Sequence, residues 1–162
     1  MLQHPTDLGA TNGVIHAIDR VILPPALLDI LADTSSVSLF HQTVGESSAS
    51  LQGSLSPDVF SGDEPLTLFV PTNDSFSRLG LPGSSPDERI GAQVVRGRWT
   101  LTELRDAGAG ASLATLSGQI FRVEAVDGEV TLVTSAGERL RPLLEQSDIR
   151  ARNGVLHVVD DR

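Results

Sequence analysis

The stretch Asn12-Gly13-Val14-Ile15-His16-Ala17-Ile18-Asp19 recurs near the end of the chain as Asn153-Gly154-Val155-Leu156-His157-Val158-Val159-Asp160. The Asn, Gly, His and Asp residues and the first Val recur in register, and the other positions exchange one small or branched apolar residue for another. Nothing between the two octets repeats, which argues against a solenoid of short units. We therefore interpret the octets as equivalent ends of repeats that are each about one domain long.

Each octet has the pattern of a turn followed by a buried strand. The Asn-Gly pair is expected to supply the positive φ angle of a tight turn. The apolar run that follows has little polar alternation, as in a strand buried on both faces. His157 lies inside this run, and the chain has no Cys. We interpret His157 as a buried, hydrogen-bonded imidazole and not as a metal ligand or a catalytic base.

The composition predicts one domain with an aliphatic core. The chain has 162 residues, with five Phe, one Trp and no Tyr, and this length is sufficient for a sizeable core. The net charge of −9 argues against binding nucleic acid or an anionic membrane surface, which both require a basic face. No apolar run has the length of a membrane helix. The first residues lack the basic start and apolar core of a signal peptide.

Local patterns along the chain predict helices first and strands later. Thr72 or Asn73 can cap a short helix after a strand over 66–70 that Pro71 ends. Capping boxes begin further helices at Ser85 and Thr100. The other expected elements are a loose segment over 1–11, a strand over 14–23, helices over 26–31 and 37–44 with Gly45 as the stop, a loop over 46–63, a strand over 93–99, and strands over 113–116, 119–126 and 129–134 joined by Gly-containing turns.

This order of elements predicts an α+β fold, in which an antiparallel β-sandwich or wedge carries several short helices. Two blocks of the sequence also resemble the signature blocks of the fasciclin domain family of adhesion proteins. They are Leu-Thr-Leu-Phe-Val-Pro-Thr-Asn-Asp-Ser-Phe over 66–76 and the octet 153–160. The resemblance covers residues 25–162. Residues 1–24 are similar to the C-terminal strand of a preceding fasciclin-like repeat, or form an N-terminal extension.

The resemblance implies a fasciclin-type fold and a structural role for the residues of the two blocks. One departure concerns Ala92-Gln93, which stand where many fasciclin domains carry Tyr-His, so integrin contact through that pair is not implied. The family-motif residues, expected to act in structure and not in ligand binding, are Phe69, Pro71, Thr72, Asn73, Phe76, Asn153, Gly154, His157 and Asp160.

For function, the resemblance implies a secreted, non-catalytic adhesion and protein-interaction module, one repeat of a tandem array in an extracellular, cell-surface or periplasmic protein, such as a bacterial or microbial surface protein. Its partner is expected to be a protein or matrix component. The sequence contains no Gly-x-Ser-x-Gly elbow and no His-x-x-x-His spacing, so no catalytic residue, metal or cofactor is predicted. Asp127-Gly128-Glu129 and Asp160-Asp161 fit a turn and a solvated surface better than a calcium loop.

The alternative function is a small-molecule carrier or a hydrolase on the same scaffold. A deep apolar pocket with a polar rim would favour it, whereas an exposed patch would favour the interaction module. A separate expectation concerns residues 14–23, because a bare apolar strand exposes its pairing groups and an apolar face. We expect it to be covered by its own domain's edge or by a neighbouring molecule, and self-association is the favoured form.

Overall fold

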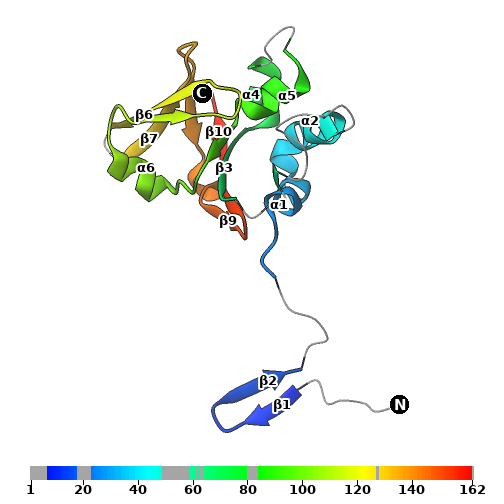
Figure 1. Cartoon of the computed structure of the whole chain (residues 1–162). Coiled ribbons are helices and arrows are strands. Elements are labelled where there is room, and N and C mark those ends of the chain that lie inside the picture. Colours follow the sequence, from blue (N-terminus) through cyan, green and yellow to red (C-terminus); the bar gives the residue numbers. More distant parts are fainter. Residues whose placement is uncertain are drawn as a thin grey trace.

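The computed structural model describes residues 7–17, 23–48, 59–60, 62, 64–79, 84–126 and 128–161. At its centre, β3 (Leu66–Pro71) and β10 (Gly154–Asp160) run parallel and side by side (Figure 1). Every residue of β3 is buried, and so is every residue of β10 except Asp160. The two signature blocks of the sequence therefore meet in the middle of the molecule, and the strand of the second octet is buried on both faces as predicted.

The sheet extends from this central pair in both directions and nearly closes into a barrel. The strand order is β4-β3-β10-β8-β7-β6-β5, and β9 pairs with the first half of β10. A bridge between Val95 and Thr115 links β4 to the chain just after β5. The predicted antiparallel sandwich or wedge is thus replaced by a mixed, barrel-like sheet with a parallel pair at its centre. The remaining strands are β4 (Val94–Arg96), β5 (Ser112–Ala114), β6 (Ile120–Val126), β7 (Glu129–Val133), β8 (Arg139–Pro142) and β9 (Ile149–Ala151).

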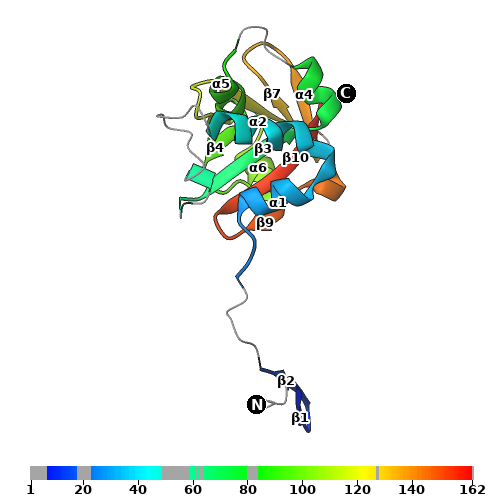
Figure 2. The same cartoon turned by 90° about the vertical axis from the view of Figure 1, so that its right-hand side faces the viewer.

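Short helices cover the side of the β3–β10 pair that faces away from the barrel (Figures 1 and 2). The last α-helix, α6, lies on the barrel side and contacts β7. The fold is therefore mixed α+β, as predicted. The helices on the first side are α1 (Leu27–Asp33), η1 (Ser35–Val37), α2 (Ser38–Ser48), α4 (Asn73–Arg78) and α5 (Pro86–Gly91); α6 spans Leu101–Ala107, and η2 (Leu144–Gln146) lies between β8 and β9.

Alternate residues of β3 point into two separate apolar cores. Leu68 belongs to the core under the helices, where the rings of Phe40 and Phe76 meet edge to face with centroids 5.9 Å apart. Phe69 belongs to the barrel core and meets Phe121 edge to face at 5.7 Å. Such aromatic pairs add to the free energy gained by burial. Because both faces of the strand are packed, β3 has no solvent side and contains almost no polar residue.

Several local predictions are confirmed. Thr72, Ser85 and Thr100 cap α4, α5 and α6, and the last two caps are complete capping boxes. Gly108 ends α6 with a positive φ angle. Gly118, Gly128 and Gly137 also have positive φ, in the turns between the strands of the barrel. Helix caps and glycine turns both depend on residues that are close together in the sequence, so they can be predicted without knowledge of the surrounding fold.

Other local predictions are wrong. Gly45 does not stop α2, which continues to Ser48 because Val44 and Ser47 remain buried against the domain and Ser47 donates a hydrogen bond to Asp87 in α5. Residues 7–10 are not loose. They form β1 (Asp7–Ala10), which pairs antiparallel with β2 (Gly13–His16). Every residue from 8 to 17 is exposed, so the burial predicted for the strand of the first octet is wrong over 14–17, and the edge of the chain's own domain does not cover these residues. The rest of the strand predicted over 14–23 lies largely outside the described residues.

The Asn-Gly pair of the second octet serves close packing and not a positive φ angle. Neither Gly13 nor Gly154 is among the residues with positive φ. A Cβ atom at Gly154 would lie 2.1 Å from the carbonyl oxygen of Leu66 and 2.9 Å from Cδ1 of Leu27. The predicted reason for this glycine is therefore wrong, since it is the backbone of the parallel neighbour β3 that excludes a side chain here.

We predict that Gly154→Ala lowers the free energy of unfolding by about 3 kcal/mol or more, because relief of the clash requires separating β10 from β3. Gly45→Ala is the matched control. Its Cβ meets nothing within 4 Å, and alanine stabilises a helix interior by up to about 1 kcal/mol relative to glycine. Urea denaturation measures both. A Gly154→Ala variant as stable as the unmodified chain would refute the close-packing role.

Candidate interaction site

Thr72 and Asn73 cap two different helices. The Thr72 hydroxyl accepts a hydrogen bond from the Ser75 N–H at 3.3 Å, which caps its own helix α4. The Asn73 side chain reaches the start of α2, where its Oδ1 accepts from the Leu39 N–H at 2.9 Å. Its Nδ2 donates to the Ser35 carbonyl oxygen at 3.1 Å. Asn73 lies at the junction of β3 and α4. Its side chain also forms hydrogen bonds with backbone groups at the start of α2, which is distant in the sequence.

Asp160 and Asp161 fasten the end of β10 to α4. The hydroxyl of the buried Ser75 lies within hydrogen-bond distance of both carboxylates, at 2.8 Å from Asp161 Oδ1. Arg78 donates from Nε to Asp161 Oδ2 at 3.0 Å and lies 3.7 Å from Asp160. The Arg78 hydrogen bond keeps the pKa of Asp161 well below its usual range. The expectation of a merely solvated acidic pair is therefore wrong.

Asn153 connects three segments from a buried position. Asn153 is only 2% exposed. Its Oδ1 accepts from the Leu27 N–H at 3.1 Å, at the start of α1, and its Nδ2 donates to the carbonyl oxygen of Phe60. Its own carbonyl oxygen accepts from the Leu66 N–H at 3.0 Å. Replacing this amide would leave buried backbone groups without partners, which is costly.

His157 is fully buried and hydrogen-bonded, which confirms the prediction for this residue. Its Nδ1 accepts from the Asp148 N–H at 3.3 Å, so Nε2 carries the proton and donates to the Trp99 carbonyl oxygen at 2.7 Å. The ring stacks on Phe69, with centroids 5.3 Å apart. Burial lowers the pKa of His157, and the Trp99 carbonyl and Asp148 oppose that change only in part. The neutral imidazole therefore joins three segments of the barrel.

The other motif residues are also packed inside the fold. Phe69 and Phe76 belong to the two cores, and Pro71 ends β3 opposite Val159. The departure Ala92-Gln93 is likewise internal: Ala92 is buried and Gln93 is half-buried. Among the motif residues, Asp160 also lines an open groove at the surface.

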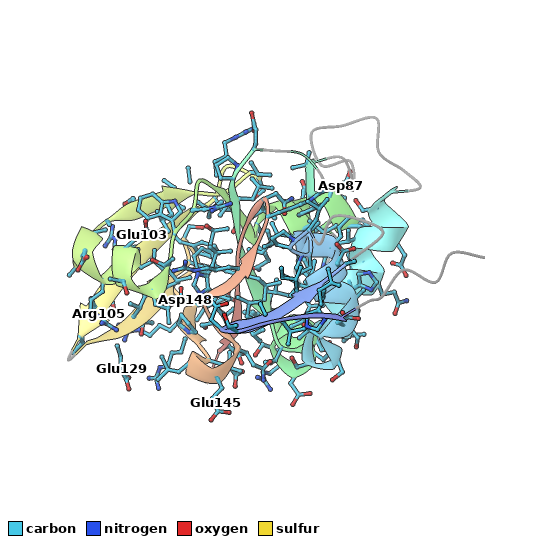
Figure 3. All side chains as sticks on the ribbon, turned by 90° about the horizontal axis from the view of Figure 1, so that it is seen from below. Asp87, Glu103, Arg105, Glu129, Glu145 and Asp148 are labelled. Atoms are coloured by element: carbon cyan, nitrogen blue, oxygen red, sulfur yellow. The ribbon has the colours of Figure 1, made fainter. Side chains whose placement is uncertain are left out.

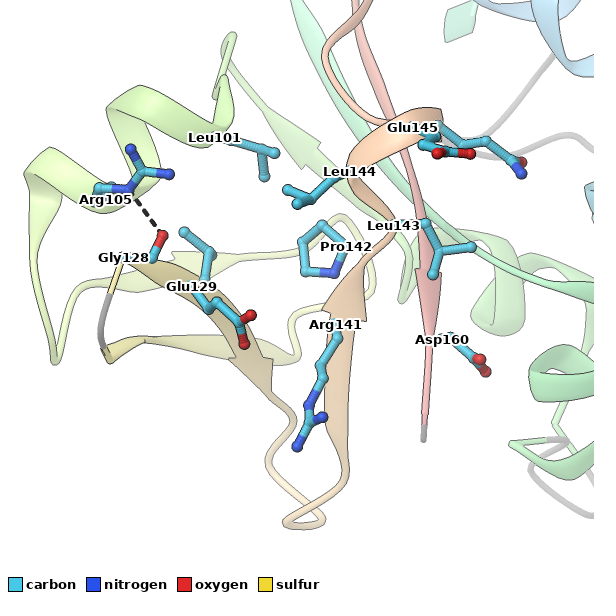
Figure 4. A pocket seen from close by; sticks show the side chains of 12 residues that line it. Leu101, Arg105, Gly128, Glu129, Arg141, Pro142, Leu143, Leu144, Glu145 and Asp160 are labelled. Carbon is cyan, nitrogen blue, oxygen red and sulfur yellow. Dashed lines mark hydrogen bonds between the residues drawn. The ribbon is translucent and has the colours of Figure 1, made fainter.

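An open groove of about 550 Å³ lies between α6, the turn from β6 to β7, β8 and η2 (Figure 4). Figure 3 shows Arg105, Glu129 and Glu145 on this side of the molecule, whereas Asp87 lies on the side of the helices. The groove is lined by Leu101, Arg105, Gly128, Glu129, Val130, Arg141, Pro142, Leu143, Leu144, Glu145, Gln146 and Asp160.

The groove has an apolar middle and charges of both signs around it. Leu101, Pro142 and Leu144 lie between the charged groups in Figure 4, and Leu144 is 76% exposed. At one end, Arg105 is held in place because its Nε donates to the Gly128 carbonyl oxygen at 3.0 Å. Arg141 extends from β8, apart from Arg105. This arrangement can bind an apolar side chain while the rim pairs with polar and charged groups.

Sequence reasoning missed this groove. Its residues come from segments far apart in the chain, so no single local pattern predicts it. One signal was available: Pro142-Leu143-Leu144 is an apolar run between Arg141 and Glu145 in a connecting segment. An apolar run in a surface connection indicates either a buried anchor or an exposed contact.

The charged groups of the groove lining are three carboxylates and two arginines. None of its lining residues is Ser, Thr, Cys, His, Lys or Tyr, so it offers no nucleophile of the kinds that form acyl or imine intermediates. Across the part of the chain that the structure describes, no three His, Asp or Glu side chains are grouped as metal ligands. Asp127, from the segment considered for calcium, lies outside the described residues. No described helix has both the length and the apolar character needed to span a bilayer.

Comparison with known proteins identifies relatives. A family model described as the fasciclin domain matches residues 42–162. Transforming growth factor-beta-induced protein ig-h3 from Sus scrofa is 26% identical over 162 residues, which cover 96% of this chain and 22% of the relative. Periostin from Homo sapiens is 26% identical over 159 residues, which cover 93% of this chain and 17% of the relative. The chain thus spans less than a quarter of either relative.

A solved structure supports the fold independently. The FAS1 domain pair from the insect cell adhesion molecule fasciclin I aligns with a TM-score of 0.62 at 18% sequence identity. The alignment covers 94% of this chain and 56% of that chain.

We predict that Thr72→Ala lowers the free energy of unfolding by about 0.5–2 kcal/mol, the usual effect of losing a helix cap. Thr102→Ala is the matched control, since Thr102 is exposed on α6 and such surface changes stay within about 0.5 kcal/mol. Thermal and urea unfolding measure the difference. A Thr72→Ala variant with unchanged stability but impaired binding would make Thr72 a contact residue instead.

We predict that the His157 imidazole titrates below its ordinary pKa of 6.5. Because the unfolded chain then binds the proton more readily, the free energy of unfolding falls as the pH drops below 6.5, by at most about 1.4 kcal/mol per pH unit for one proton. NMR of the imidazole and urea titrations between pH 7.5 and about 5.5 test this. His157→Gln should remove this contribution. An imidazole that titrates at or above 6.5 would contradict it.

Proposed function

Because the chain belongs to the fasciclin domain family, we propose that it is a non-catalytic adhesion and protein-interaction module of an extracellular, cell-surface or periplasmic protein. The observation that carries this proposal is the open groove beside η2, with its exposed leucine and its charged rim. The aligned FAS1 domain pair comes from an insect cell adhesion molecule, which also supports an adhesion function.

The groove has the anatomy of a protein interface. Protein interfaces commonly have an apolar centre, on which a few anchoring side chains act, and a polar rim that pairs with the partner. Here Leu144 and Leu101 supply the apolar centre, and Arg105 and Arg141 stand at its edge with Glu129. Arginine is enriched at such interfaces because its planar group forms bidentate hydrogen bonds while its stem packs on apolar surface.

The expected partner is a protein or matrix component that presents an apolar side chain beside charges of both signs. Its charges can pair with Arg141 and Glu129 on the rim, while the apolar side chain covers Leu144. The net charge of −9 keeps nucleic acid an unfavourable partner. The binding site differs from the position of Ala92-Gln93, which lies in a buried to half-buried segment on another part of the fold.

A second candidate function, a small-molecule carrier, has one observation in its favour. The groove volume of about 550 Å³ falls within the range of small-molecule sites. The exposure of Leu144 counts against it, because carrier sites enclose most of their ligand. A hydrolase has less support, since the groove lining provides no serine, cysteine or histidine.

We predict that Leu144→Glu reduces binding at least tenfold, because it places a carboxylate in the apolar centre of the groove. Tenfold corresponds to about 1.4 kcal/mol, within the effect of an interface anchor. The chain is immobilised on a sensor and exposed to solubilised surface and matrix proteins from the source organism. The melting temperature should not change, because Leu144 is 76% exposed in the folded protein.

Leu39→Glu is the matched control, since Leu39 is also an exposed leucine but lies on α2, on the side of the helices. It should bind as the unmodified chain does. Equal binding by all three proteins would remove the groove from the proposal. Saturable binding of an apolar fluorescent probe that Leu144→Glu abolishes, without any protein partner, would favour the carrier. Turnover of ester or glycoside substrates would contradict the non-catalytic function.

A further inference from the structure

The groove lies where the sheet divides between β7 and β8. Pairing between these two strands ends at Leu132 and Leu140. The next residues of β8, Arg141 and Pro142, pair with β10 instead. Residues 129–131 of β7 therefore pair with β6 on one side, and the start of β7 borders the groove on the other side (Figure 4).

The backbone groups of Val130 are directed toward this side. The Thr134 N–H donates to the Glu138 carbonyl oxygen at 2.9 Å, across the turn from β7 to β8. Because the backbone groups of a strand turn to its two neighbours alternately, Leu132 and Val130 face the same way as Thr134. The residue of β6 that pairs with Leu132 turns both of its backbone groups away from β7, which gives the same alternation.

Pro142 cannot complete the strand pairing at Val130. If the register of β7 and β8 continued, Pro142 would lie opposite Val130, and proline has no N–H to donate. The Val130 carbonyl oxygen therefore receives no hydrogen bond from β8. A strand edge with such an acceptor is a template for another strand, and edges of this kind bind extended peptides by strand addition.

The side chains beside this edge specify two residues of the added strand. The Val130 side chain is buried in the barrel core, so the residue opposite it points to the same face, where Leu101 packs against that core. The exposed Leu144 lies next to Leu101 in Figure 4, and an apolar side chain here would cover it. Glu129 is exposed and points to the other face, so it favours a basic residue opposite it.

Arg141 specifies the residue before the apolar one. In an antiparallel strand that residue lies opposite Thr131, at the position that Arg141 would occupy if β8 continued beside β7. Arg141 is exposed, and neither it nor Glu129 forms an ion pair with another residue that the structure describes. An acidic side chain is therefore favoured here, since opposite charges on neighbouring strands attract.

We propose that the groove binds an extended polypeptide segment, which adds a strand antiparallel to the free edge of β7. The segment carries an acidic residue beside Arg141, then an apolar residue opposite Val130, then a basic residue opposite Glu129. The N–H of its apolar residue donates to the Val130 carbonyl oxygen. This inference rests on the proposed binding function and specifies the kind of partner that the groove takes.

A short capped peptide with aspartate, leucine and lysine at its centre and serines on both sides tests the proposal. It is titrated into the full chain labelled with ¹⁵N. With the peptide at about ten times its Kd, hydrogen exchange at the Val130 amide should slow about tenfold, because most of the chain is then in the bound state.

Two matched peptides test the hydrogen bond to the strand edge. N-methylation of the leucine removes the donor to Val130 and should weaken binding at least about tenfold. N-methylation of the first serine, outside the paired stretch, should leave the affinity unchanged. Glu129→Lys should weaken binding about threefold, and a peptide with glutamate in place of its lysine should restore it.

Three results would overturn the inference: no binding up to about 1 mM peptide, binding without slower exchange at Val130, or equal affinity for the peptide methylated at leucine. If surface proteins still bind in a manner that Leu144→Glu abolishes, the proposed function stands and strand addition alone fails. If the peptide binds as expected but Leu144→Glu does not change the binding of surface proteins, strand addition stands and the proposed function fails.

Discussion

The contact between the backbones of β3 and β10 is the constraint on which the rest of the structure depends. Gly154 lets the two strands approach so closely that a Cβ atom would lie 2.1 Å from the Leu66 carbonyl oxygen. The parallel pair that results has both faces buried, and its alternate side chains fill the core under the helices and the core of the barrel. Since each core contains residues of both strands, neither half of the domain can pack without the pair.

Buried polar groups fix the segments around this pair. Asn153 holds the start of α1 and the Phe60 segment, His157 holds the Trp99 and Asp148 segments, and Ser75 holds the end of β10. Each is a short polar side chain whose partners are mostly backbone groups or charges of other segments. Burial of such groups is favourable only when their hydrogen bonds are made. They therefore specify one arrangement of the segments, which apolar packing alone does not.

How much of this was predictable depends on the range of the interaction. Helix caps such as Thr72 and Thr100 act within one turn, so the sequence predicted them. The end of α2 depends on packing beyond Gly45. The parallel direction of β10 depends on a neighbouring strand more than eighty residues away. The hydrophobic periodicity of the sequence therefore predicted neither feature. The likeness of the two octets was evident, but the strand of residues 7–10 was missed because its apolar pattern is weak without its hairpin partner. The groove required the fold itself, since α6, β8 and η2 become neighbours only there.

The residues that identify the fold and the residues that form the groove are nearly separate sets. Phe69, Asn153 and His157 are buried in contacts within the domain, so their side chains are not accessible to a partner. The groove is built from Arg105, Arg141 and Leu144 and their neighbours, which lie outside both signature blocks. These side chains can change without disturbing the β3–β10 pair. It follows that the signature blocks specify the scaffold, whereas under the proposed function the choice of partner would depend on the surface around η2, which can change while the blocks stay the same.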